Sequence, residues 1–302
     1  MEIVNTPLLT SLLADEWHKK AQEGKPTALG TKLRYSSAHG CSRQIGYSAM
    51  DVIPTEPVDI AGAWVMGVGT VIHELVQEAI GRAYPNAEFE VASQVNDYIS
   101  GSCDAFIPEE DFGAGWSGGN VLFELKTMGT YSFDSQVGLD RMRGKWKDKG
   151  AEGPKAGAIV QAGMNALGIE KARGIRIDTL IMGSITFEAV SKNKARSLDL
   201  NDVRRVMNEF HISRDEWEPL AQAEIDRLTE IGSFLDESLF PDRWALDDQG
   251  RETKLDPFGR NWQCDYCAFR TTCVNDGEGQ IRFSVSKALP DYFRYEKHPD
   301  DK

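Results

Sequence analysis

The sequence lacks any apolar run that we expect to be long enough to span a bilayer. Its first residues also lack the basic stretch and the small-residue cleavage site of a secretory signal. We therefore expect a cytoplasmic protein. Thiols stay reduced in that compartment, so the five cysteines are not expected to form a disulfide framework. They are predicted to be metal ligands or core residues.

An excess of positive charge is also missing, because 47 acidic residues against 34 Lys and Arg give a net charge of −13. Proteins that coat nucleic acid nonspecifically are usually basic, so this balance argues against that class. Residues 141–155 depart from it with a local charge of +4 around Trp146. The segment is either a solvated surface or a phosphate track with an aromatic platform for a base. The candidate DNA-binding residues are Arg141, Arg143, Lys145, Trp146, Lys147 and Lys149.

Several architectures are excluded by further absences. The chain has no internal repeat and no low-complexity tract. Its glycine-rich segment, residues 113–119, lacks the Gly-Lys-Ser/Thr ending of a phosphate-binding P-loop. No helicase motif is present, so any unwinding of a duplex would need a partner.

The pattern of apolar residues predicts an α/β fold with a mixed central sheet flanked by helices. Val71 and Leu75 belong to a helical stripe that we expect to face the core. A long helical region near the C-terminus is expected to break at residues 211–214. Strands are predicted over residues 88–95, 98–107, 120–128 and 175–185, and helices over residues 6–22, 63–83, 155–167 and most of 200–239.

Two of the predicted strands carry carboxylates that suit a hard divalent cation. Alternate side chains of a strand share a face, so Glu124 and Lys126 point the same way and Leu125 points to the other side. If the two strands pair as a hairpin, Asp104 and Glu124 converge on one Mg²⁺ or Mn²⁺ ion. The backbone carbonyl of Leu125 is a further candidate ligand. Lys126 would orient the attacking water or neutralise developing charge on a phosphodiester.

His73 and Gln161 are further candidates for this site. An imidazole ligand at His73 would favour Mn²⁺ somewhat over Mg²⁺, and Gln161 would position the water or the Lys126 ammonium. Each residue alone has an ordinary structural explanation, and only their order along the chain points to a site. Cys103, next to Asp104, is expected to face the core as a small apolar residue.

Three cysteines close the chain as C-x2-C-x5-C, namely Cys264, Cys267 and Cys273. Three cysteines within ten residues indicate metal binding in a reducing compartment. The fourth ligand must come from far away, with Cys41 as the natural candidate and His39 as its rival. An all-thiolate set suits either Zn²⁺ or an iron–sulfur cluster, and the spacing does not decide between them.

Taken together, these motifs resemble the PD-(D/E)XK nuclease superfamily. They are most similar to RecB-like exonucleases with a [4Fe–4S] cluster, a group that includes CRISPR-associated exonucleases and the AddB nuclease domain. The resemblance runs from Cys41 to Cys273 and implies a restriction-endonuclease-like core whose N- and C-terminal regions are stapled by the cluster. The chain departs from the family at Asn165, where tyrosine is usual, and at Cys103, where proline is frequent.

The resemblance also implies a role for each matching residue. It places the cluster on Cys41, Cys264, Cys267 and Cys273. It places His73, Asp104, Glu124 and the Leu125 carbonyl around the divalent metal, and it makes Asp104, Glu124, Lys126 and Gln161 catalytic. The small size suits a CRISPR-associated or phage-encoded enzyme acting in DNA repair or recombination. A phage-encoded enzyme would act in the cytoplasm of the host cell.

We accordingly expect an Mg²⁺- or Mn²⁺-dependent DNA exonuclease acting on single-stranded or free ends, with a structural [4Fe–4S] cluster and a possible homo-oligomeric state. The alternatives are a non-catalytic iron–sulfur or zinc nucleic-acid-binding module and an iron–sulfur electron carrier. A single domain is predicted. Its regions are a helical segment to residue 62, a nuclease core over 63–190, a helical and cysteine-containing region over 191–276 and a polar tail over 277–302.

Overall fold

The computed structural model describes residues 29–140, 145–147, 150–186, 203–247, 251–258 and 261–282, together with Glu16 and Lys19. Most of the helix predicted over residues 6–22, and Arg141, Arg143 and Lys149, therefore lie outside the described residues. The chain divides into two compact units. The sheet unit comprises Met1–Ala38 and Asp59–Ile225, and the cysteine unit comprises His39–Val58 and Asp226–Lys302. These divisions do not coincide with the predicted region boundaries after residues 62, 190 and 276.

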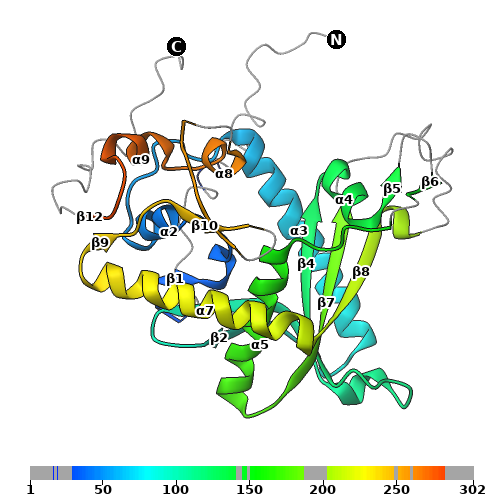
Figure 1. Cartoon of the computed structure of the whole chain (residues 1–302). Coiled ribbons are helices and arrows are strands. Elements are labelled where there is room, and N and C mark those ends of the chain that lie inside the picture. Colours follow the sequence, from blue (N-terminus) through cyan, green and yellow to red (C-terminus); the bar gives the residue numbers. More distant parts are fainter. Residues whose placement is uncertain are drawn as a thin grey trace, which may run out of the picture. The chain divides into compact units, whose positions relative to one another are not determined.

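The sheet unit is built on six strands in the order β1-β3-β4-β7-β8, with β2 also paired to β3 (Figure 1). β3 is antiparallel to β2 and β4, β4 is parallel to β7, and β7 is antiparallel to β8. The predicted mixed sheet flanked by helices is thus confirmed. The strands are β1 (Leu33–Arg34), β2 (Glu88–Gln94), β3 (Ile99–Ile107), β4 (Asn120–Met128), β7 (Ile177–Thr186) and β8 (Met207–Ser213).

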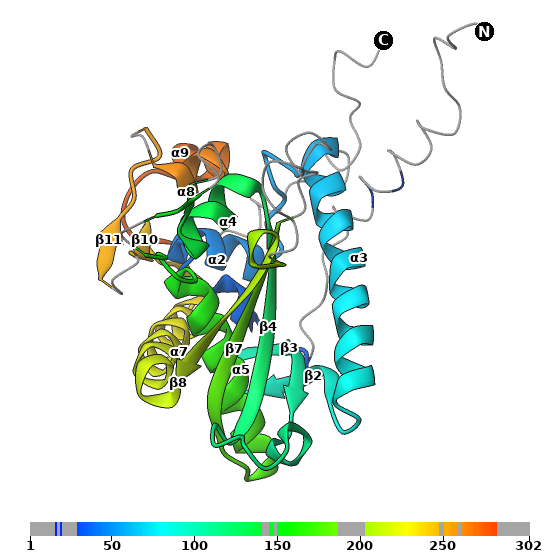
Figure 2. The same cartoon turned by 90° about the vertical axis from the view of Figure 1, so that its right-hand side faces the viewer.

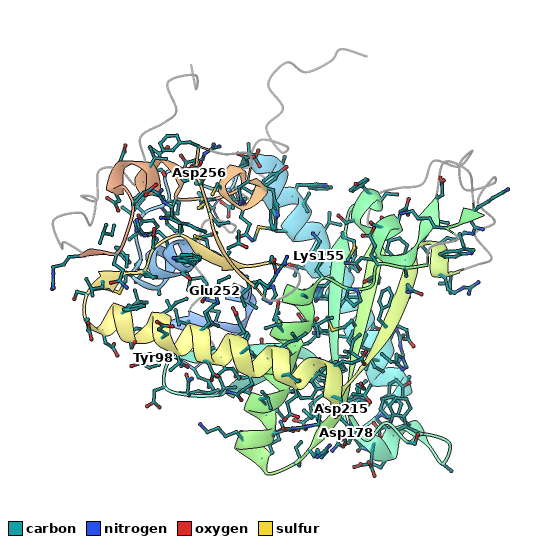
Figure 3. The ribbon with its side chains drawn as sticks, in the orientation of Figure 1. Tyr98, Lys155, Asp178, Asp215, Glu252 and Asp256 are labelled. Carbon is teal, nitrogen blue, oxygen red and sulfur yellow. The ribbon has the colours of Figure 1, made fainter. Side chains whose placement is uncertain are left out.

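Two helices lie on opposite sides of this sheet, as Figure 2 shows. α3 (Ile60–Ala83) contacts β3 and β4 on one side, and α5 (Ala156–Arg173) packs on the other. A shorter helix, α4 (Thr130–Val137), follows β4. α7 (Arg214–Asp236) follows β8 at the end of the sheet where β7 begins. Figure 3 labels Asp178 and Asp215 at this end. The core between these elements includes Val121, Leu122, Val160, Met164 and Leu180, all fully buried.

The predicted core stripe of α3 is wrong at Val71 and Leu75, whereas Ile80 packs against the buried core of the sheet. The side chains of Val71 and Leu75 are 55% and 60% exposed, and Ile60 and Trp64 on the same side of the helix are exposed as well. By length and composition alone α3 could cross a membrane, so the expectation that no segment reaches that apolarity is also wrong. The face that packs on the sheet carries Gly69 instead, where an added Cβ would meet Thr127 Oγ1 at 3.0 Å.

The helical prediction is also wrong over residues 207–210, and the break predicted at residues 211–214 is the end of a strand, because β8 occupies Met207–Ser213. Its side chains alternate between exposed and half-buried, which is the periodicity of a strand on the edge of a sheet. The pairing with β7 runs from Thr179↔Ser213 to Ile185↔Met207. The long helix begins only at Arg214, whose guanidinium bridges Glu170 of α5 and Glu218.

The cysteine unit brings together two segments that are distant in the sequence. Short strands pair as β9 with β12 and β10 with β11, and an aromatic cluster joins Tyr47 to Phe240 and Phe269. The amide of Glu56 donates to the Ala268 carbonyl. The elements are α2 (Ser42–Ala49), β9 (Leu239–Phe240), β10 (Trp244–Leu246), β11 (Glu252–Lys254), α8 (Trp262–Asp265), α9 (Arg270–Asp276) and β12 (Ile281–Arg282).

Candidate active site and cysteine centre

The hairpin expected between the strands of Asp104 and Glu124 is present, since β3 and β4 are antiparallel neighbours. Their register pairs Ala105 with Phe123, and no paired residues follow toward Asp104 and Glu124. One carboxylate oxygen of Asp104 instead accepts the backbone N–H of Leu125, with N···Oδ2 at 2.6 Å. The structure therefore brings the two acidic positions to one place, at the point where the strands stop pairing.

Glu124 lies at the centre of a polar network inside the sheet unit. Its Oε1 accepts hydrogen bonds from Lys126 Nζ at 2.7 Å and from Gln161 Nε2 at 2.7 Å. Lys126 Nζ also donates to Gln161 Oε1 at 2.9 Å, which closes a three-membered ring of contacts. Leu125, between the two charged residues, is buried at 3% exposure, as the strand alternation predicts. Gln161, which sequence reasoning placed near Lys126, thus contacts both partners.

His73 reaches the same place from α3. Its Nδ1 lies 3.1 Å from Asp104 Oδ1, and this hydrogen bond raises the pKa of the imidazole, whereas its partial burial opposes the shift. The N–H and C=O groups of one strand residue point to the same side. Because the Leu125 N–H donates to Asp104, its carbonyl is expected on the same edge of β4. The metal-ligand roles of these groups stay a prediction.

One atom of the network has no hydrogen-bond partner. Glu124 is 3% exposed, and its Oε2 is buried without a donor within reach, although its Oε1 accepts two bonds. A buried carboxylate oxygen left without a donor is costly, and a hard cation is a partner that would satisfy it. The donor set therefore fits Mg²⁺ or Mn²⁺. Across the described parts of the chain, no three His, Cys, Asp or Glu side chains are already arranged as ligands of one ion.

Burial raises the pKa of Glu124 to about 7, with the Lys126 ammonium opposing the shift and the Asp104 carboxylate adding to it. The folded protein therefore holds a proton on Glu124 at pH values where the unfolded chain has lost it. A group of this kind stabilises the fold fully below its unfolded pKa, and its contribution is lost as pH rises through the folded pKa.

We therefore expect the metal-free protein to lose on the order of 3 kcal/mol of stability between pH 5 and pH 8. Urea unfolding in EDTA at a series of pH values measures this loss. Mn²⁺ should reverse it at pH 8, because the ion binds the ionised carboxylate. In Glu124→Gln the same pH dependence should be absent. An equal slope in both proteins would contradict the assignment to Glu124.

The sequence analysis did not predict Gln77 and Glu90, which form a hydrogen-bonded chain to the backbone of Asp104. Gln77 Nε2 donates to the backbone carbonyl of Asp104 at 3.2 Å and to Glu90 Oε1 at 2.9 Å. Glu90 has a φ of 49°, a left-handed conformation that is uncommon outside glycine. Its other oxygen accepts from the Ser102 hydroxyl at 3.2 Å. The signal for Gln77 was its position four residues after His73, which places both on one face of α3.

The described part of the predicted DNA-binding segment forms a small hairpin. β6 (Lys145–Trp146) pairs with β5 (Leu139–Asp140), and the Lys147 amide donates to the Gly138 carbonyl. The indole of Trp146 is 37% exposed. The guanidinium carbons of Arg204 and Arg205 lie 5.4 and 5.7 Å from its ring centroid. These two arginines were not predicted, because they lie more than fifty residues further along the sequence.

All four predicted cluster cysteines belong to the cysteine unit and line one cavity. Cys41, at the start of α2, joins Cys264 of α8, Cys273 of α9 and Cys267 between them. The rival ligand, His39, is absent from the described residues that line this cavity. Burial first, and then the neighbouring sulfurs, raise the pKa of Cys264 to about 11. Cys103 lies in the sheet unit and is fully buried, as expected.

The donor chemistry of this cavity fits a thiolate-ligated metal centre. Backbone and side-chain N–H groups already point at two of the sulfurs: the Phe269 amide at 3.4 Å from Cys267 Sγ, and Arg243 Nε at 3.1 Å from Cys273 Sγ. Positive charge and hydrogen-bond donors stabilise thiolates when they bind a metal. Stapling by a cluster is not itself shown, and its identity stays a prediction.

Comparison with known proteins gives distant likenesses to solved structures. No protein-family model matches the chain, and no curated protein matches it. The solved structure of a protein described as SSO0001 is similar over 88% of this chain and 96% of its own, with 17% identity and a TM-score of 0.48. A phage-related exonuclease from Haemophilus somnus 129PT is similar over 74% of this chain and 92% of its own, with 12% identity and a TM-score of 0.40. Likenesses this distant carry no argument about activity.

Proposed function

We propose that the protein is an Mg²⁺- or Mn²⁺-dependent exonuclease that hydrolyses DNA from single-stranded ends. The observation that carries this proposal is the buried Glu124 carboxylate, with one oxygen bonded to Lys126 and Gln161 and the other lacking any hydrogen-bond partner. The Asp104 carboxylate accepts the backbone N–H of Leu125, the residue that follows Glu124 on β4. Acidic oxygens and an ammonium nitrogen gathered at one point are what phosphodiester hydrolysis requires.

A divalent ion bound here would lower the pKa of its water and polarise the phosphate. Asp104 and Glu124 would hold the ion, with His73 and the Leu125 carbonyl as the remaining protein ligands. Lys126 would place its ammonium where negative charge develops on the phosphate oxygens. Gln161 fixes Lys126 through its Oε1 and Glu124 through its Nε2, so the ammonium stays beside the carboxylate.

The exposed indole of Trp146, with Lys145 and Lys147 beside it, is proposed as the place where a single strand enters. An indole stacks on any base, and the two lysines would contact phosphates without reading sequence. The cysteine centre, proposed as a [4Fe–4S] cluster, would have a structural role in ordering the C-terminal segment.

Linear and circular single-stranded DNA of the same sequence, each incubated with Mn²⁺ or with EDTA, test this function. We expect the linear strand to be degraded with Mn²⁺ and the circle to survive, because an exonuclease needs an end. Cleavage of both would indicate an endonuclease. Binding of both without cleavage would indicate the non-catalytic module, and cleavage in EDTA would contradict the metal-dependent site.

A further inference from the structure

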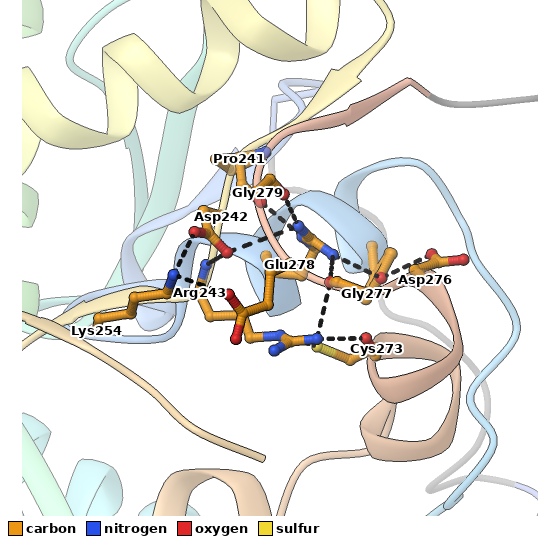
Figure 4. Close-up of polar contacts among 11 residues, drawn as sticks. Pro241, Asp242, Arg243, Lys254, Cys273, Asp276, Gly277, Glu278 and Gly279 are labelled. Carbon is orange, nitrogen blue, oxygen red and sulfur yellow. Dashed lines mark hydrogen bonds and ion pairs between the residues drawn. The ribbon is translucent and has the colours of Figure 1, made fainter. Parts of the chain in front are cut away.

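Two arginines are buried inside the cysteine unit, with Arg43 at 0% and Arg243 at 3% exposure. Figure 4 draws the polar contacts around Arg243. A guanidinium cannot be deprotonated in a protein, so both carry their charge into the interior. A buried charge is costly unless it is paired and hydrogen-bonded. The partners of each arginine therefore show which groups offset its buried charge.

The contacts of Arg43 are explained by the fold. Its Nε donates to the Pro241 carbonyl at 2.6 Å, and its terminal nitrogens donate to the carbonyls of Gly277 and Gly279. Its Nη2 also lies 3.8 Å from a carboxylate oxygen of Asp242. Arg43 thus ties α2 to Pro241, just after β9, and to the segment before β12, and a carboxylate balances its charge.

Arg243 is different, because one of its partners is a sulfur. Its Nε donates to Cys273 Sγ at 3.1 Å, and its Nη2 donates to the carbonyls of Cys273 and Gly277, both at 2.8 Å. Within the described part of the chain, no carboxylate lies within 4.0 Å of its guanidinium. Asp242 and Glu278 act on it only over longer distances. Of the groups that Arg243 touches, Cys273 is the one that can carry a negative charge.

We propose that Arg243 is the counter-charge of the cysteine centre, and that it fixes Cys273 and offsets the negative charge of the metal–thiolate group. The inference rests on the proposed centre. Four thiolates carry two more negative charges than Zn²⁺ or an oxidised [4Fe–4S] core carries positive ones, so either group leaves a net negative charge to be offset. Hydrogen bonds to the sulfurs and nearby positive charge retain such a group and raise its reduction potential.

Two matched substitutions separate this role from a purely structural one. Arg243→Gln removes the charge that donates to Cys273. Arg43→Gln removes a buried charge that lines the same cavity but donates to backbone carbonyls and to no sulfur, and that acts on Cys41 only over a longer distance. Both proteins are purified without oxygen and reconstituted with iron and sulfide. Iron and sulfide per chain, absorbance near ~400 nm, the rate of iron loss to a chelator, the midpoint potential and the urea midpoint are then measured.

In Arg243→Gln we expect iron to be lost to the chelator roughly 10–100-fold faster and the midpoint potential to become more negative. Arg43→Gln should lower the urea midpoint and change both quantities much less than Arg243→Gln does, because its guanidinium acts on Cys41 only over a longer distance. If Arg243→Gln does not fold, Arg243→Lys takes its place; it keeps the charge but loses the planar fork, so it should lose iron faster with a smaller change in potential.

Three results would overturn the inference. The first is a folded Arg243→Gln or Arg243→Lys protein that loses iron to the chelator at the wild-type rate. The second is a change in iron loss and midpoint potential in Arg43→Gln as large as that in Arg243→Gln. If the wild type takes up zinc and no iron, release of zinc to a colorimetric chelator replaces the iron measurements. A wild type that binds neither metal overturns the centre and the inference together. The nuclease assay is independent of these readouts, so failure of one proposal is distinguishable from failure of the other.

Discussion

Replacing Lys126 by alanine is expected to lower Mn²⁺-dependent cleavage of linear single-stranded DNA by a factor on the order of 10²–10³. The ammonium lies 2.7 Å from Glu124 Oε1 and 2.9 Å from Gln161 Oε1, so it is held beside the proposed ion before substrate arrives. A donor fixed in this way stabilises developing charge without reorganisation, and its loss falls mainly on kcat. Single-turnover cleavage of an end-labelled strand measures the effect.

Lys171→Ala is the matched control, because that lysine lies on α5 and donates only to the Val95 carbonyl. It should cleave at the wild-type rate. Binding of the same strand, measured in EDTA, should be nearly unchanged in both variants. A Lys126→Ala protein that cleaves like Lys171→Ala would remove Lys126 from the reaction and would favour the non-catalytic alternative.

Replacing Cys264 by serine is expected to reduce iron from about four per chain to less than one, with loss of the absorbance near ~400 nm. Cys264 is buried in α8 and shares its cavity with the three other cysteines. The strands of this unit are only two or three residues long, so the aromatic cluster, the hydrogen bonds of Arg43 and Arg243 and the proposed centre must hold them together. Limited proteolysis should therefore cut within residues 226–282 of the variant.

Cys103→Ala is the control for this experiment, since Cys103 is equally buried but lies on β3 in the sheet unit. Its iron content and proteolysis pattern should match the wild type. Retention of four irons by Cys264→Ser would contradict the proposed ligand set. Equal loss of iron from both variants would show that iron binding does not depend on the predicted cysteines.

The carboxylate site was predictable because its parts follow local rules. The alternation of strand residues places Glu124 and Lys126 on one side and Leu125 on the other. Strands that follow one another in the sequence usually pair, and the pairing of β3 with β4 brings Asp104 close. The contact of Gln161 with both Glu124 and Lys126 did not follow from periodicity. The sequence analysis expected Gln161 to position the Lys126 ammonium or the water, and it did not predict the contact with Glu124.

Other features were not predictable from local patterns. Helical periodicity in α3 identifies an apolar side but cannot tell which side packs on the sheet. In this chain Gly69, His73 and Gln77 face the strands, and Val71 and Leu75 lie outside. Arg43 and Arg243 gave no signal in the sequence, because their partners are backbone carbonyls, a hydroxyl, a carboxylate and one sulfur, some of them more than two hundred residues away.

The discontinuous cysteine unit has a consequence for the order in which the protein is made. Cys41 leaves the ribosome more than two hundred residues before Cys264, a delay of about 10–45 s at typical elongation rates. Residues 59–225, which complete the sheet unit, emerge within that interval. The carboxylate site can thus fold before the three C-terminal cysteines have been synthesised. A metal centre that needs all four cysteines can form only near the end of translation.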